Sequence, residues 1–177
     1  MDIAVLFADV RRSTALGEQL APAAFAALLN RFYHAATETL IRYDAIIDKL
    51  IGDEVMALFI PGFCGPRYRR RAAEASVALL KAMGYGQHAE PLLPLGAAVN
   101  SGVAYVGNVG GAGTMDFTAL GDVVNTASRM QSAAMVGEVV LSEPVYAEVA
   151  DEFPGVQSRT LNLRGKEAPV AARVLKI

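Results

Sequence analysis

The first apolar run of the chain covers residues 3–8 and ends at Asp9. A run of this length without polar alternation is typical of a strand that is buried on both faces. Apolar residues then recur at helical spacing over residues 16–40, and Pro22 divides this stretch into two predicted helices. Hydroxyls of the N-cap type at residues 13–14 mark the start of the first helix. The pattern therefore predicts a buried strand that carries a carboxylate at its end and leads into helices.

The middle of the chain alternates short apolar runs with turn residues. Runs at residues 45–51 and 55–60 flank a Gly-Asp pair, which predicts a hairpin. Helical spacing predicts a helix over residues 69–83. Residues 95–109 are apolar and interrupted by glycines, which predicts one strand with another backbone close to it.

The last third of the chain repeats short strands and helices. The predicted strands cover residues 117–120, 139–141, 157–163 and 170–177, and the predicted helices cover residues 123–134 and 143–149. The full order β-α-α-β-β-α-β-β-α-β-α-β-β predicts an α+β fold with a ferredoxin-like βαββαβ core. We expect an antiparallel-rich mixed sheet with helices packed on one face, so that the other face is free for a partner.

Composition limits the classes of protein that this fold can serve. A length of 177 residues and a mass of 18.7 kDa fit a single domain, residues 1–177. An apolar content of 53% excludes disorder. The net charge is −2, Trp is absent and aromatic residues make up 7%, so neither charge steering nor base stacking favours a nucleic-acid polymer as ligand. One cysteine and two histidines cannot assemble a zinc cluster.

Two further features of the sequence bear on location. No apolar run approaches the roughly 18 residues of a membrane span, and the N-terminus carries no basic leader before an apolar stretch. We therefore expect a cytoplasmic domain without membrane insertion. Because the first strand follows the N-terminus at once, we expect either a minimal stand-alone domain or a piece of a longer protein with regulatory domains outside the chain.

Asp9 and Asp53 are the first candidates for chemistry. They belong to adjacent strands if the ferredoxin-like order holds, and two carboxylates brought together repel unless a cation lies between them. Mg2+ or Mn2+ is held in this way, by one or two carboxylates and substrate phosphates. Residues 10–15 lead into a helix N-terminus, whose free N–H groups bind phosphate. The alternative is that Asp9 caps the next helix and Asp53 is a turn residue.

The helix predicted after Gly121 carries a second candidate group. Asp122 is a suitable N-cap, and Asn125 and Arg129 are four residues apart, so both project from one helix face. An amide and a guanidinium so placed would hold a ribose oxygen and a phosphoryl oxygen, and would stabilise charge that develops at phosphorus. The alternative is a pair of solvated polar residues on a surface helix.

Three segments taken together resemble one known family. Residues 7–10 (FADV), 49–57 (KLIGDEVMA) and 117–129 (FTALGDVVNTASR) are similar in order and spacing to the motifs of the class III adenylate/guanylate cyclase catalytic domain. The resemblance covers nearly the whole chain and implies two Mg2+ or Mn2+ ions per active site. It assigns roles to eight residues: metal binding to Asp9, Val10 and Asp53, purine reading to Lys49 and Thr118, ribose and transition-state contacts to Asn125 and Arg129, and a phosphate contact to Lys166.

Two positions depart from the commonest pattern of that family. Thr118 stands where most of its adenylate cyclases carry Asp, which is similar to the class IIIb subgroup. A threonine hydroxyl accepts a hydrogen bond from the adenine amino group or donates one to the guanine carbonyl, so it discriminates less sharply than a carboxylate. Asp116 lies on the same strand face and is expected to assist. Lys49 favours ATP, because guanylate cyclases of the family usually carry Glu there. Arg12-Ser13 stands where the family commonly has Gly-Phe or Gly-Ser.

The resemblance implies an adenylate cyclase that converts ATP to 3′,5′-cyclic AMP and pyrophosphate, by two-metal-assisted attack of the ribose 3′-hydroxyl on the α-phosphate. The family builds each site from two chains, so we expect a homodimer with two equal sites. Three alternatives stay open: a guanylate cyclase, a weakly active nucleotide-binding regulatory module of the same fold, and another two-metal enzyme. A dinucleotide-forming cyclase is an example of the last, but its Gly-Gly-Asp/Glu-Glu-Phe signature is missing from the sequence.

A cluster of arginines at residues 67–71 stands at the start of the helix predicted over residues 69–83. A solvated helix start is the plain interpretation. Four cations near the positive end of a helix dipole are nevertheless unfavourable enough to hint at a partner or a phosphate.

Overall fold

The structure is a computed structural model that describes residues 1–87, 90–111 and 113–177. Its strands are β1 (Asp2–Val10), β2 (Ile46–Ile51), β3 (Glu54–Phe59), β4 (Leu95–Val103), β5 (Tyr105–Gly111), β6 (Thr114–Leu120), β7 (Glu138–Ser142), β8 (Ser158–Leu161) and β9 (Val170–Lys176). Its helices are α1 (Ser13–Gln19), α2 (Pro22–Arg42), α3 (Pro61–Cys64), α4 (Tyr68–Ala82), α5 (Asp122–Ser132) and α6 (Glu143–Tyr146).

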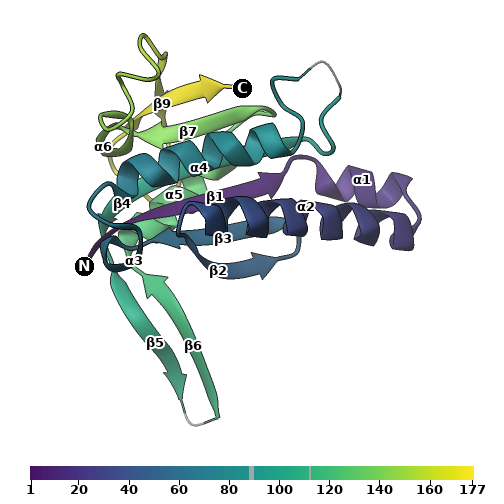
Figure 1. Cartoon of the computed structure of the whole chain (residues 1–177), viewed down its shortest axis with the longest axis horizontal. Coiled ribbons are helices and arrows are strands. Elements are labelled where there is room, and N and C mark those ends of the chain that lie inside the picture. Colours follow the sequence, from purple (N-terminus) through teal and green to yellow (C-terminus); the bar gives the residue numbers. More distant parts are fainter. Residues whose placement is uncertain (88–89, 112) are drawn as a thin grey trace.

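The main sheet has the order β2-β3-β1-β4-β7-β9-β8 (Figure 1). β1 lies between β3 and β4 and is antiparallel to both, whereas β4 and β7 are parallel. The first four strands of this order, β2-β3-β1-β4, are ferredoxin-like, and the first and third strands of the chain are neighbours as predicted. The fold is therefore α+β with a mixed, mostly antiparallel sheet, which confirms the predicted fold class.

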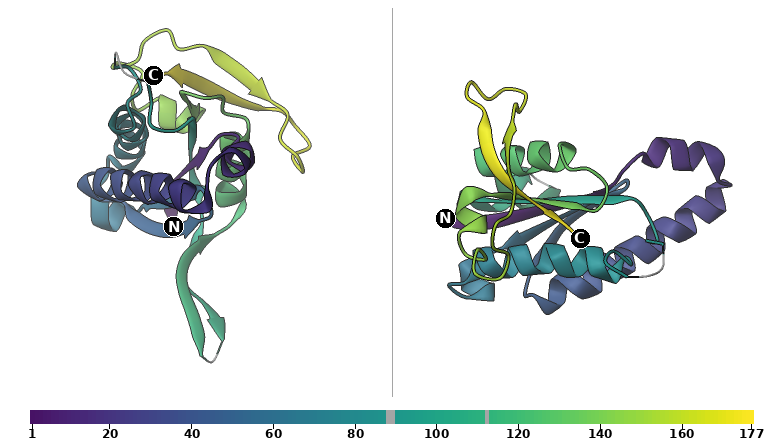
Figure 2. Two further views of the ribbon diagram at one scale, coloured as in Figure 1. Left: turned by 90° about the vertical axis from the view of Figure 1, so that its right-hand side faces the viewer. Right: turned by 90° about the horizontal axis from the view of Figure 1, so that it is seen from above.

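Helices cover both faces of this sheet (Figure 2). On one face, Leu6 of β1 belongs to a core cluster with residues of α2 and α4. On the other face, Val5 of β1 belongs to a second cluster with Val123 and Ala127 of α5. The prediction that helices cover one face and leave the other free is wrong, because a strand that is apolar on both faces needs a cover on each.

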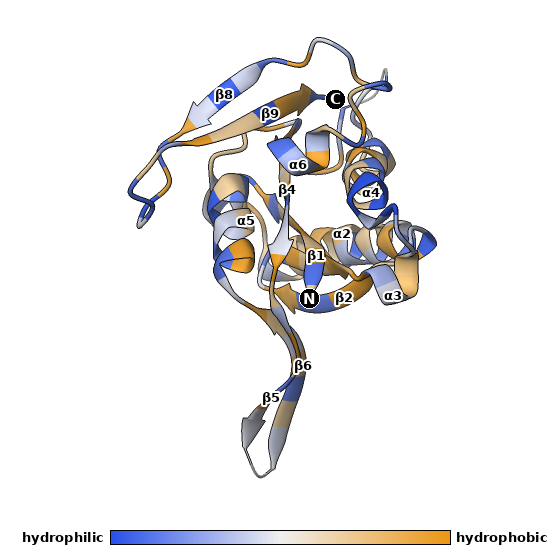
Figure 3. Cartoon of the chain, turned by 90° about the vertical axis from the view of Figure 1, so that its left-hand side faces the viewer, coloured by the Kyte–Doolittle hydropathy of each residue, from blue (hydrophilic) through white to orange (hydrophobic). Residues whose placement is uncertain are grey.

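β5 and β6 leave the sheet and form a two-stranded ribbon that projects from the body (Figures 1 and 3). The prediction of one strand over residues 95–109 is therefore wrong, since β4 ends at Val103 and β5 begins at Tyr105. Between them, the N–H of the buried Ala104 donates to the Met1 carbonyl, and its own carbonyl accepts from the Met1 ammonium. This contact fixes the point where the ribbon departs. The ribbon exposes four large apolar side chains: Tyr105, Met115, Phe117 and Leu120.

Most other bounds agree with the pattern within a few residues, including the break between α1 and α2 at Pro22. The short helix α3 was not predicted, because four residues are too few to show a period. The helix predicted over residues 143–149 ends early, at Tyr146. None of the helices in the described part of the chain combines the length and apolarity that a membrane crossing requires.

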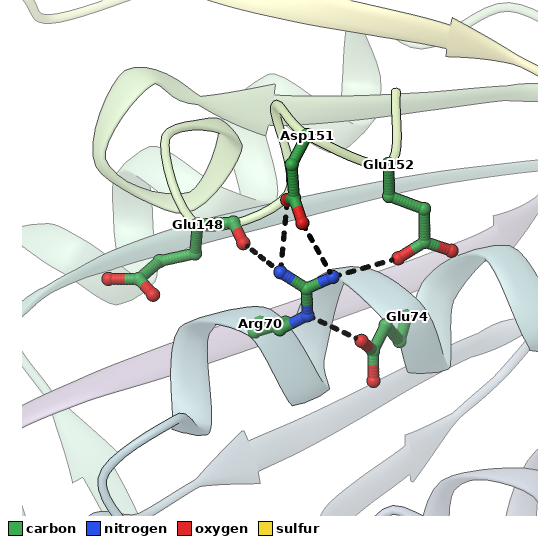
Figure 4. Close-up of polar contacts among 5 residues, drawn as sticks. All are labelled: Arg70, Glu74, Glu148, Asp151 and Glu152. Atoms are coloured by element: carbon green, nitrogen blue, oxygen red, sulfur yellow. Dashed lines mark hydrogen bonds and ion pairs between the residues drawn. The ribbon is translucent and has the colours of Figure 1, made fainter. Parts of the chain in front are cut away.

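Three of the four arginines at the start of α4 form ion pairs within the chain. Figure 4 shows Arg70 among Glu74, Glu148, Asp151 and Glu152. Its Nε donates to Glu74 at 2.9 Å, and its Nη1 donates to the Glu148 carbonyl at 2.7 Å and to Asp151 at 3.0 Å. The network ties α4 to the segment that follows α6. Two neighbouring arginines are paired as well, Arg69 with Asp2 and Arg71 with Asp44. These pairs account for three of the four charges that hinted at an external partner.

A buried ion pair joins β7 to β8 across β9. Glu138 of β7 is 2% exposed. Its carboxylate accepts hydrogen bonds from Arg159 of β8 at 2.7 and 2.8 Å and from the Met135 N–H at 3.0 Å. The bonds from Arg159 hold the pKa of Glu138 below its ordinary value of 4.5.

We expect Arg159→Ala to lower the free energy of unfolding by about 2 kcal/mol near neutral pH, because the buried carboxylate loses its partner. The carboxylate of Glu138 stabilises the fold above pH 4.5, and this contribution is lost as the pH falls through the lower pKa of the folded state. Urea denaturation should therefore show the two proteins converging in acid. Arg31→Ala, on the exposed side of α2, is the control. A difference that stays constant down to about pH 3 would contradict this account.

Candidate active site

The end of β1 and the turn of the β2–β3 hairpin bring two carboxylates together. Asp9 pairs with Glu54 of β3, and the Val10 N–H donates to the Asp53 carbonyl at 3.2 Å. Asp9 and Asp53 are therefore neighbours, as the strand order predicted. The alternative role of Asp9 as a helix cap is wrong, since Arg12 is the N-cap residue of α1 and no side chain caps that helix.

Charge is crowded around Asp9. Burial raises its pKa to about 6; Arg11 opposes the shift and Asp53 adds to it. Burial likewise raises the pKa of Glu54 to about 7, and the charge of Asp9 adds to that shift. Arg11 Nη2 donates to Asp9 Oδ2 at 2.9 Å, whereas Asp9 Oδ1 is buried and has no partner among the described residues. A half-buried pair of carboxylates with one unused oxygen is an electrostatic environment that a cation would relieve.

The donor set fits a divalent ion that is shared with a substrate. In the described ranges, no three His, Cys, Asp or Glu side chains converge as a metal-binding group. Mg2+ is commonly held by one or two carboxylates and completed by substrate phosphates and water, and Asp9 and Asp53 could supply such carboxylates. The Val10 side chain is buried in the core, so a part for Val10 in metal binding falls to its backbone carbonyl.

The segment after Asp9 borders the same site. Arg12 has φ 58°, a left-handed conformation that costs a non-glycine residue roughly 1–2 kcal/mol. This explains why glycine suits the position. Ser13 and Thr14 were predicted to be N-cap residues, and this is wrong, because they are the first residues of α1. Both line a hollow of about 240 Å3 that also includes Asp53. The N-terminus of α1 therefore opens next to the paired carboxylates.

The two predicted purine readers meet between β2 and the base of the ribbon. Lys49 of β2 forms an ion pair with Asp116 of β6, and its pKa is raised, chiefly by that hydrogen bond. Thr118, also on β6, donates from Oγ1 to Asp48 Oδ2 at 3.0 Å, and the same oxygen lies 3.5 Å from Lys49 Nζ. The placement of Asp116 on the face of Thr118 is confirmed. Asp48 was not predicted, because strand alternation assigns it to the face opposite Lys49.

The α5 group is assembled from the helix and the loop before β9. Gly121 is the N-cap, with φ 146°, so the predicted cap Asp122 is instead the first helical residue. Its carboxylate forms an ion pair with Lys166, which lowers the pKa of Asp122. Asn125 is exposed, and Arg129 borders a hollow of about 380 Å3 next to residues 162–164. Lys166 and the two polar residues thus belong to one neighbourhood around α5.

The hydrogen bonds of the paired carboxylates stay close to their own end of β1. Within residues 1–87, 90–111 and 113–177, no hydrogen bond or ion pair links the metal-binding candidates Asp9 and Asp53 to a residue of the purine or α5 groups. Arg11, the partner of Asp9, does reach the Ser132 carbonyl at the end of α5, at 3.5 Å. The candidate side chains themselves therefore make no direct contact between the groups.

Comparison with known proteins identifies the family. Residues 1–174 match the adenylate and guanylate cyclase catalytic domain, and the chain belongs to that family. The adenylate cyclase of Mycobacterium tuberculosis (strain H37Rv) is 30% identical over 168 residues, which are 93% of this chain and 37% of that protein. Adenylate cyclase 1 of Rhizobium meliloti is 27% identical over 135 residues, 73% of this chain and 20% of that protein. The chain thus spans well under half the length of these curated relatives.

Solved structures agree with this assignment. The crystal structure of the adenylyl cyclase CyaB from P. aeruginosa superposes with a TM-score of 0.85 at 30% identity, over 99% of this chain and 94% of that one. The guanylyl cyclase Cya2 superposes with a TM-score of 0.86 at 24% identity, over 98% and 91%, and shows the likeness of fold.

We expect Asp53→Asn to lower the pKa of Asp9 from about 6, because a neutral amide no longer repels the ionised form of Asp9. The pKa should stay above the ordinary 3.8, since burial is the largest cause of the shift and persists. An NMR titration of the side-chain carboxyl groups in metal-free buffer measures this. Glu38→Gln, on the exposed face of α2, is the matched control. An unchanged Asp9 pKa in Asp53→Asn would show that the two carboxylates do not interact.

Proposed function

We propose that this chain is the catalytic domain of an adenylate cyclase, which converts ATP to 3′,5′-cyclic AMP and pyrophosphate. The observation that carries the proposal is the pair Asp9 and Asp53, half-buried, with an unpartnered oxygen on Asp9. Membership of the cyclase catalytic domain family and 30% identity to adenylate cyclases support it. The presence of Lys49 rather than Glu supports ATP over GTP as the substrate.

In the reaction, the 3′-oxygen of the ribose forms a bond to the α-phosphorus, and the bond from that phosphorus to the pyrophosphate oxygen breaks. Asp9, Asp53 and the Val10 carbonyl would hold two divalent ions, which would supply Lewis-acid activation of the 3′-hydroxyl and neutralise phosphate charge. No protein base is assigned, and the hydroxyl proton leaves to water. Arg129 stabilises the charge that develops at the α-phosphate, and Asn125 orients the ribose.

The remaining residues position the substrate. Lys49 and Thr118 bind the purine edge, and Lys166 contacts phosphate. The Lys166 ammonium is held by Asp122 in the structure, so it must exchange this carboxylate for a phosphoryl oxygen when the nucleotide binds. ATP as substrate places the domain in the cytoplasm in this proposal.

A homodimer completes the proposed sites, with Asp9 and Asp53 from one protomer and the purine and α5 groups from its partner. The lack of a direct hydrogen bond or ion pair between the Asp9–Asp53 pair and the purine and α5 side chains of the described chain supports this arrangement. The apolar ribbon supports it as well, because its exposed Met115 and Phe117 have no cover in the described chain. A surface of this kind marks an interaction site.

The reaction is tested by incubating the protein with Mn2+ and either ATP or GTP and identifying the product by chromatography. We expect cyclic AMP, and a loss of at least about 100-fold in kcat/KM for Asp53→Asn, since that residue holds the ions. Glu38→Gln should retain full activity. Formation of cyclic GMP from GTP, with no cyclic product from ATP, would instead identify a guanylate cyclase. Nucleotide binding without any cyclic product would identify a regulatory module.

Site sharing is tested by mixing two inactive variants, Asp9→Ala and Arg129→Ala. Random exchange makes half of the dimers mixed, and each mixed dimer carries one intact site of two, so about a quarter of the wild-type activity should return. Size-exclusion chromatography confirms that both variants are dimeric. Well-folded mixtures that stay inactive would contradict shared sites.

A further inference from the structure

Asp48 occupies an irregular position in β2. Ile47 pairs with Ala57 and Lys49 pairs with Met56, so the register shifts at Asp48 and leaves it without a partner of its own on β3. Successive residues of a regular strand point to opposite faces, and a β-bulge changes this locally. Here the bulge brings Asp48 Oδ2 to within 3.5 Å of Lys49 Nζ, so both side chains reach the purine group.

The Asp48 side chain is fully buried, at 0% exposure, and Thr118 is 6% exposed. Its Oδ2 accepts the hydrogen bond from Thr118 Oγ1, and its Oδ1 has no partner among the described residues. Burying a carboxylate is costly unless it is paired and hydrogen-bonded. A carboxylate placed here, at the base of the ribbon and beside the purine readers, calls for a reason other than stability.

The hydrogen-bonding capacity of the Thr118 hydroxyl provides a reason for the buried carboxylate. A threonine hydroxyl has one hydrogen to donate and two lone pairs to accept with, whereas a carboxylate only accepts. The single hydrogen of Thr118 is therefore directed at Asp48. Towards a bound base, the hydroxyl presents lone pairs alone.

We propose that Asp48 is a specificity-determining positioning residue, which fixes Thr118 as a hydrogen-bond acceptor and so selects adenine over guanine. The proposal rests on the proposed function of this site. Adenine presents an amino donor where guanine presents a carbonyl acceptor. An adenine amino group satisfies Thr118, while a guanine carbonyl would meet it acceptor to acceptor. Asp48 thus prevents the Thr118 hydroxyl from donating to a guanine carbonyl, while it can still accept from an adenine amino group.

Lys49 favours ATP in that it replaces the Glu that guanylate cyclases of the family usually carry, but it does not by itself reject guanine. An ammonium only donates, so it serves an acceptor on either purine. It is also held between Asp48 and Asp116. The rejection of guanine therefore falls to the Thr118 hydroxyl and to the carboxylate that orients it.

The test is the ratio of kcat/KM for ATP to kcat/KM for GTP. Asp48→Asn keeps the shape of the side chain but offers an amide donor to Thr118 Oγ1, which frees the hydroxyl hydrogen for a guanine carbonyl. We expect the ratio to fall about tenfold, the effect of one hydrogen bond. Glu38→Gln is the control, because it makes the same kind of change, from a carboxylate to an amide, on the exposed face of α2. It should leave the ratio unchanged.

Thr118 variants provide a second measurement that does not depend on Asp48→Asn folding. Thr118→Ser keeps the hydroxyl and should preserve the ratio, whereas Thr118→Val removes it and should lower the ratio. In the Thr118→Val background, Asp48→Asn should have no further effect on the ratio, because its target is gone. An unchanged ratio in Thr118→Val overturns the proposal.

The outcomes separate this inference from the proposed function. If a folded Asp48→Asn protein loses activity equally on ATP and GTP, Asp48 is structural and the inference is wrong, while the cyclase assignment stands. If the wild type makes no cyclic nucleotide, the cyclase assignment fails. Calorimetric titration with ATP and with GTP, each with Mg2+, then decides: a preference for ATP that Asp48→Asn abolishes supports the inference, and equal binding of both nucleotides by the wild type overturns it.

Discussion

The antiparallel pairing of β1 with β3 is the constraint on which the rest of the molecule depends. Its register runs from Ala4 opposite Phe59 to Asp9 opposite Glu54. Both faces of β1 are buried, so a slip of one residue would exchange the side chains of the two core clusters, and the register is strongly specified. The same register sets the hairpin turn beside Asp9. The hydrophobic core thereby determines where the carboxylates meet.

This arrangement brings acidic side chains together where they are partly buried. The raised pKa values of Asp9 and Glu54 have burial as their first cause. Arg11 offsets part of the charge but leaves one oxygen of Asp9 unused. A tightly compensated carboxylate would have little affinity left for an ion, so the proposed metal binding at Asp9 would come at a cost in stability. Glu138 is the opposite case: both oxygens of this buried carboxylate accept hydrogen bonds from Arg159, and we assign it no catalytic role.

Local pattern predicted the strands, the hairpin and the juxtaposition of Asp9 with Asp53, because burial and turn residues leave periodic signals in the sequence. It missed the break at Ala104, because the apolar pattern continues through that residue and the cause is a distant contact with Met1. It also missed the cover that α5 provides, since helix periodicity does not say which face of a sheet a helix will choose. The contact of Asp48 with the purine group was missed for a related reason. A β-bulge depends on how two strands pair, so the sequence of one strand does not reveal it.

The β5–β6 ribbon connects an exposed part of the molecule to the purine group. Thr118 is buried beside Asp48, and two residues further along the same strand Leu120 is exposed. The N-terminus holds the chain at Ala104, where the ribbon leaves the body. A partner that shifted the ribbon would therefore act on Thr118 and its contact with Asp48 more directly than on Asp9 and Asp53. If Thr118 reads the base as proposed, the position of the ribbon and the identity of the bound base would each influence the other.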